Sequence, residues 1–188
     1  MTRKPNPIAE DIARDVLNQL SILRVDRGRY ISGPYEYVEP EPSGTMHDHE
    51  VYLYERCTVC ALGACLLSYV RMHDDVPIQR ILAARPQSPL KSARWSIEAA
   101  SIDVIWELRK VFNQEQLDLI ESAFERFDMS VHQTNVNAAI SFGMHYAKDK
   151  DGWPTHEHAV LAAIMRNILE HRGHFVPEDI HNQEGAKS

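Results

Sequence analysis

The segment Cys57–Met72, with the sequence CTVCALGACLLSYVRM, is the least polar part of the chain and contains all three of its cysteines. Its first half is made mostly of small residues, and a helix surface of small side chains lets a neighbouring backbone approach closely. We therefore expect a central helix that is buried around most of its circumference. Gly63 lies inside this helix, where glycine costs about 1 kcal/mol relative to alanine, and a tight packing contact would explain its presence.

Capping signals and apolar periodicity predict further helices on both sides of this segment. Asn6 and Pro7 are typical of an N-cap and a first helical position, and the apolar spacing that follows extends to Leu23. Beyond the cysteine segment we expect a short helix over 77–84, a longer helix over 92–112, a helix capped by Asn113, a helix opened by Thr134 or Asn135, and a last long helix capped by Thr155 and closed by Gly173.

The region from Gly28 to Arg56 has a different character, rich in tyrosine and proline. Short pieces typical of strands lie at 30–31, 35–38 and 51–54, and the breaker-rich sequence EPEPSGT separates the last two. These pieces predict a small β-hairpin beside the helices.

Together these patterns predict a mainly α fold. At 188 residues the chain is long enough for one domain with a real core. We expect a single-domain helical bundle over 7–177, with about six or seven helices and a hairpin or loop insertion at 28–56, before the central cysteine helix. The polar ends, 1–6 and 178–188, are predicted to be flexible tails.

Composition excludes several classes of function. The net charge is −7, which argues against general binding to nucleic acids or anionic membranes, because both require a cationic surface. No apolar run reaches the ~18 residues that a membrane span needs, and the N-terminus lacks a signal-peptide pattern. An odd number of cysteines, most of them on one predicted helix, favours a reducing, cytoplasmic compartment over a disulfide framework.

The cysteines have two interpretations. Cys57 and Cys60 have the two-residue spacing of one arm of a zinc site, and His47 or His49 in the preceding acidic HDHE loop could supply nitrogen ligands. A structural zinc site needs four ligands, however, and the chain has no second CxxC or HxxxH arm. Free cysteine in an apolar context also behaves as a small hydrophobic residue. We therefore expect no cofactor and keep a zinc site as the alternative.

The sequence carries no catalytic signature: it contains no GxSxG, no phosphate-binding glycine loop, no dinucleotide fingerprint and no HExxH. We accordingly assign no catalytic residues and favour a non-enzymatic binding or accessory protein. Its predicted binding face for a protein partner or small ligand consists of the hairpin tyrosines Tyr30, Tyr35, Tyr37, Tyr52 and Tyr54. The alternative is a metal-dependent enzyme, or a zinc-stabilised domain, that uses His47, His49, Cys57 and Cys60. Assembly into a homodimer through an exposed helix face is left open.

The segment 60–64, CALGA, resembles an uncharacterised family of small bacterial and phage proteins, known as a domain of unknown function, in which CALGA opens a central helix. The stretch 148–160, KDKDGWPTHEHAV, is similar to that family's polar turn before a Thr-x-x-Glu-Val helix start, but it has His158 and Ala159 where glutamate is expected. The resemblance implies a small helical fold and a phage or mobile-element setting. It implies no activity and no catalytic residues.

Overall fold

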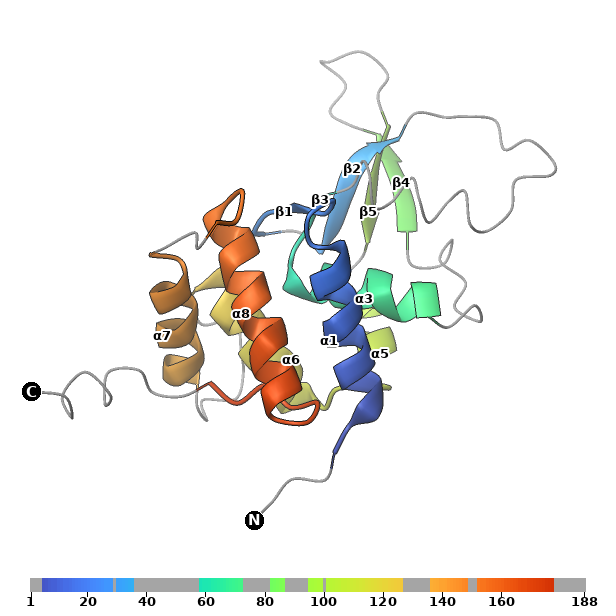
Figure 1. Cartoon of the computed structure of the whole chain (residues 1–188). Coiled ribbons are helices and arrows are strands. Elements are labelled where there is room, and N and C mark those ends of the chain that lie inside the picture. Colours follow the sequence, from blue (N-terminus) through green and yellow to red (C-terminus); the bar gives the residue numbers. More distant parts are fainter. Residues whose placement is uncertain are drawn as a thin grey trace, which may run out of the picture.

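The computed structural model describes residues 5–28, 30–35, 58–72, 82–86, 95–99, 101–126, 136–148 and 152–177. Within these residues the chain is mainly helical, with a small β-sheet, as the sequence predicts (Figure 1). The helices are α1 (Pro7–Gln19), α3 (Ala61–Met72), α5 (Ser101–Leu108), α6 (Gln114–Glu125), α7 (Val136–Tyr146) and α8 (His156–Glu170). The strands are β1 (Arg24–Val25), β2 (Ile31–Tyr35), β3 (Thr58–Val59), β4 (Leu82–Pro86) and β5 (Trp95–Ala99).

Helix α3, the predicted cysteine helix, lies at the centre and contacts α1, α5 and α6. Nine of its twelve residues are buried, which confirms the expected central helix. A Cβ placed on Gly63 would lie 1.6 Å from the carbonyl oxygen of Tyr30, so only glycine fits beside this backbone. One hydrophobic core contains residues of all six helices named above.

The helix starts follow the predicted caps. The side chain of Asn6 accepts a hydrogen bond from the Ala9 N–H at the start of α1, and Asn113 and Thr155 cap α6 and α8 in the same way. These caps accept hydrogen bonds from N–H groups of the first helical turn, which have no carbonyl partner within the helix. Of the described helices, none has the length and apolarity required to cross a membrane.

The strands form one sheet in the order β1-β3-β2-β5-β4, in which β1 and β3 are parallel and the other pairs antiparallel. β2 lies within the predicted insertion 28–56 and pairs with β3, which follows it, so a small β element precedes α3 as predicted. The segment 36–57, which contains the predicted strand 51–54 and most of 35–38, lies outside the described residues. In Figure 1 the strands β2, β4 and β5 extend beyond the helical body.

Two predicted helices are wrong in part. In the predicted helix over 77–84, residues 82–84 belong to the strand Leu82–Pro86. In the predicted helix over 92–112, Trp95–Ala99 is a strand, and the described residues that are helical are Ser101–Leu108. In 95–99 apolar residues alternate with Ser96 and Glu98, so the segment fits a strand as well as the start of a helix. Pairing of β5 with β2 and β4 decides between the two, and such non-local pairing outweighs local propensity.

Candidate functional site

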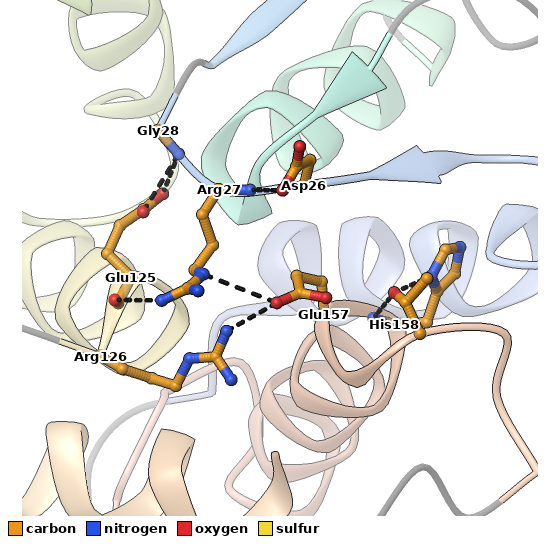
Figure 2. A network of polar contacts seen from close by, with 8 residues as sticks. Asp26, Arg27, Gly28, Glu125, Arg126, Glu157 and His158 are labelled. Carbon is orange, nitrogen blue, oxygen red and sulfur yellow. Dashed lines mark hydrogen bonds and ion pairs between the residues drawn. The ribbon is translucent and has the colours of Figure 1, made fainter.

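A cluster of charged residues lies where the loop after β1 meets the end of α6 and the start of α8 (Figure 2). The guanidinium groups of Arg27 and Arg126 both reach the Oε1 atom of Glu157, at 3.5 Å from Arg27 Nε and 2.7 Å from an Arg126 terminal nitrogen. Burial raises the pKa of Glu157, but the hydrogen bond and charge of Arg126 and the charge of Arg27 outweigh it, so the pKa is lowered. Glu157 is therefore ionised at neutral pH and joins the two arginines.

Glu125, the last residue of α6, belongs to the same cluster. Both of its carboxylate oxygens accept a hydrogen bond from the Gly28 N–H at 3.1 Å, and its side chain is almost fully buried. Burial raises the pKa of Glu125, and this outweighs the opposing effects of the Gly28 hydrogen bond and the two arginines.

One turn earlier on α6, Glu121 accepts a hydrogen bond from the hydroxyl of Tyr30 at 2.5 Å. Burial raises the pKa of Glu121, although the hydrogen bond from Tyr30 opposes this rise. Burial also raises the pKa of the Tyr30 hydroxyl, and the hydrogen bond to Glu121 and the charge of the Glu121 carboxylate raise it further. Tyr30 is half-buried, and its carbonyl oxygen accepts the Cys60 N–H at 3.2 Å. Tyr30, one of the five predicted binding tyrosines, is thus bonded to the helical body.

Cys60 lies immediately before α3, against Tyr30 and α6. Burial raises the pKa of its thiol to about 12, although backbone N–H groups of Gly63 and Leu62 bond the sulfur and oppose the rise. Burial likewise raises the pKa of Cys65 to about 12. Both thiols are therefore protonated at neutral pH, whereas the thiolate is the form that binds metals and attacks electrophiles.

The other predicted zinc ligands, His47, His49 and Cys57, lie outside the described residues. Within the part of the chain that the structure describes, no three His, Cys, Asp or Glu side chains are grouped so as to hold a metal ion. Of the proposed set, the structure therefore places Cys60 alone.

The sheet brings together residues that are far apart in sequence. Tyr35 pairs with Trp95, and Trp95 pairs with Pro86, at the end of the sheet away from β1. We call these three positions the aromatic end of the sheet. Alternate positions of a strand belong to one face, so Gly33, Ile97 and Ala84, which also pair with one another, share a face with the aromatic end.

The opposite face has a different composition. In β5, Glu98 pairs with Ser32 of β2 and Ala83 of β4. Ser96 of β5 likewise pairs with Pro34 of β2 and Arg85 of β4. The register therefore separates an apolar face from a more polar face.

The five predicted binding tyrosines therefore have different outcomes. Tyr30 bonds Glu121, Tyr35 belongs to the aromatic end, and Tyr37, Tyr52 and Tyr54 lie outside the described residues. Trp95 was missed, because the segment that contains it was predicted to be helical.

The charged cluster was also missed by the sequence analysis. Glu121 and Glu125 follow Leu117 at spacings of four and eight, so they continue a row that begins at a buried leucine. That spacing is the one sequence signal that could have indicated their burial.

No family model, no curated protein and no solved structure matches this chain. The resemblance of residues 60–64 to an uncharacterised family therefore stays a prediction.

Proposed function

We propose that this protein is a non-enzymatic binding protein that engages a partner protein through the aromatic end of its sheet. The observation that carries the proposal is the register that pairs Tyr35 with Trp95 and Trp95 with Pro86. Tyrosine and tryptophan are the residues that most often dominate binding energy at protein interfaces. Here one tyrosine and one tryptophan occupy paired positions on adjoining strands.

The position of these strands supports the same function. Among the described elements, β5 makes its principal contacts with β2 and β4, and the sheet extends beyond the helices (Figure 1). β4 is also an end strand in the order of the sheet, and such strands offer backbone groups to an added strand.

The charged cluster supports a structural role over a catalytic one. Its hydrogen bonds and ion pairs connect the loop after β1 with α6 and α8, and Figure 2 shows the partners of the Glu125 and Glu157 carboxylates. The Glu121 carboxylate is bonded by the Tyr30 hydroxyl. Carboxylates with such partners hold the loop after β1 against α6 and α8.

The proposed setting is the cytoplasm. Cys60 and Cys65 are free thiols buried in the core, as in proteins of reducing compartments. An origin in a phage or mobile element rests on the CALGA resemblance alone.

The test compares partner capture by the full-length protein and by three variants. Wild type, Tyr35→Ala, Trp95→Ala and the control Trp106→Ala are immobilised, and proteins retained from a lysate are quantified by mass spectrometry. Trp106 is a matched control because it is a tryptophan on α5 that is 67% exposed and outside the sheet.

We expect wild type and Trp106→Ala to retain the same partner in equal amounts. When that partner is purified and titrated, we expect Trp95→Ala to bind it about 30-fold more weakly than wild type does. Equal affinity of wild type, Tyr35→Ala and Trp95→Ala for every retained protein would overturn the proposal. Circular dichroism of each variant excludes loss of folding as the cause.

A further inference from the structure

Residues 174–177 follow α8 and are held in a slot between α6 and α8. In Figure 1 the chain turns after α8 and continues toward α7. Two side-chain amides, Gln116 of α6 and Asn167 of α8, bond the backbone of this segment from the two helices. We call the space between these amides the amide slot.

Each amide bonds both polar groups of one residue. Gln116 Nε2 donates to the carbonyl oxygen of Phe175 at 3.1 Å, and the Phe175 N–H donates back to Gln116 Oε1 at 2.5 Å. Asn167 Nδ2 donates to the carbonyl oxygen of Val176 at 2.9 Å, and the Val176 N–H donates back to Asn167 Oδ1 at 2.8 Å.

This pattern is that of a strand inside a sheet. In an extended chain the N–H and C=O groups of successive residues point to opposite sides. Gln116 therefore takes the place of a neighbouring strand on one side, and Asn167 does so on the other. Both amides are buried, with 3% and 7% of their surface exposed, so they satisfy backbone groups that would otherwise lack partners away from water.

One side chain anchors the segment. Phe175 is fully buried, and its ring meets the ring of Phe142 of α7 edge-on, with 5.2 Å between ring centroids. The backbone bonds are independent of side-chain identity, so the anchor supplies the selectivity of the slot. A segment that fits must be extended and must carry an aromatic residue, followed here by an aliphatic one.

The segment lies outside α8, which ends at Glu170. It is joined to the helix by one turn, in which Arg172 and Gly173 both have positive φ, of 54° and 85°. The Asn6 N–H bonds the Arg172 carbonyl oxygen at 2.9 Å, so this turn is fixed to the start of α1 separately from the amide slot.

We propose that the amide slot is a peptide-binding site, which the chain's own residues 174–177 occupy and which a partner protein enters by exchanging them for an extended aromatic–aliphatic segment. The site is independent of the aromatic end of the sheet. Its occupant is recognised by two amide–backbone pairs and one aromatic anchor. The chain's own segment competes with the partner at the high effective concentration of a tethered ligand.

The experiment uses full-length protein with Phe175→Ala, which removes the anchor while Gln116 and Asn167 remain. An acetylated and amidated peptide with the sequence of residues 174–179, HFVPED, is added, and thermal unfolding is followed. We expect the melting temperature to rise by about 3–6 °C when the peptide is at ten times its Kd. The same peptide with alanine in place of phenylalanine binds about 100-fold more weakly. No shift at peptide concentrations on the order of 1 mM, in a variant that unfolds cooperatively, would overturn the proposal.

A second pair of substitutions tests the backbone pairs. In the Phe175→Ala chain, Gln116→Ala leaves two peptide groups without partners, and we expect the peptide Kd to rise about 10-fold or more. Gln114→Ala, on the same helix, is the matched control and leaves Kd unchanged, because the Gln114 amide bonds Asp118 and Arg109. Equal Kd values in the two variants would also overturn the proposal. If Phe175→Ala does not fold, Phe175→Leu retains more of the anchor volume and repeats both measurements.

Discussion

The hydroxyl of Tyr30 donates a hydrogen bond to the carboxylate of Glu121 at 2.5 Å, and this bond joins the start of β2 to α6. The backbone of Tyr30 is held as well, because its carbonyl oxygen accepts the Cys60 N–H and lies against Gly63 of α3. One residue therefore fixes the sheet to two helices.

Tyr30→Phe removes the donor and leaves the Glu121 carboxylate without this bond. We expect the free energy of unfolding at pH 7 to fall by about 1–3 kcal/mol, the cost of a partly buried acceptor that loses its partner. Urea denaturation measures the loss. Tyr146→Phe, at a tyrosine that is 41% exposed, is the control and changes stability by less than about 0.5 kcal/mol. Equal losses in the two variants would contradict a role for the Tyr30–Glu121 bond.

The raised pKa of Glu121 and that of Glu125 predict how stability depends on pH. A carboxyl group whose pKa is higher in the folded protein binds its proton more tightly there, so folding is favoured below the unfolded pKa and loses that contribution as pH rises through the folded pKa. Starting from the ordinary value of 4.5, the wild type should therefore lose stability relative to Glu121→Gln as pH increases. Urea denaturation at several pH values from 4.5 upward measures this difference.

Two further glutamates, Glu115 and Glu157, help to identify the contribution of Glu121 to the pH dependence of stability. Glu115→Gln, at an exposed position on the same helix, is the matched control substitution. Glu157 has a lowered pKa, so its contribution is present above the unfolded pKa and is lost as pH falls through the folded value. A wild type that gains stability relative to Glu121→Gln above pH 4.5 would show that the sign is wrong.

We expect Gly63→Ala to destabilise the protein more than Gly152→Ala does. The new Cβ would lie 1.6 Å from the Tyr30 carbonyl oxygen, so α3 and β2 must separate, and we expect a loss of at least about 3 kcal/mol. Gly152→Ala is the matched control: its φ is +81°, but no atom lies within 4 Å of its Cβ position. Its cost is the conformational one alone, about 1–2 kcal/mol. Thermal unfolding distinguishes these values, and similar losses would contradict the close contact at Gly63.

The features that the sequence predicted are those set by neighbouring residues. Asn6, Asn113 and Thr155 bond N–H groups three residues further along the chain, so their caps can be recognised locally. The central position of α3 follows from its own composition, because a helix with so few polar side chains has no face suited to water.

The features that the sequence missed depend on residues far apart along the chain. The segment with Trp95 is a strand because it pairs with Tyr35 on one side and Pro86 on the other, and its short apolar run fits either structure. Arg27 and Glu157 meet across 130 residues of sequence, and nothing local to either indicates the other. The candidate binding surface and the charged cluster both belong to this second class.

The two buried cysteines give the last prediction, which also tests the zinc alternative. Because burial raises the pKa of Cys60 and of Cys65 to about 12, the reactive thiolate is scarce at neutral pH, and neither residue should react with iodoacetamide in the native protein. Peptide mapping by mass spectrometry identifies the labelled cysteines, and labelling in urea is the control that shows both thiols to be free. For the same reason, protein purified without chelator should hold far less than one zinc per chain by elemental analysis. Stoichiometric zinc that is lost in Cys60→Ser would instead show that the Cys60 thiolate is a ligand, and would favour the metal-dependent alternative over a binding protein.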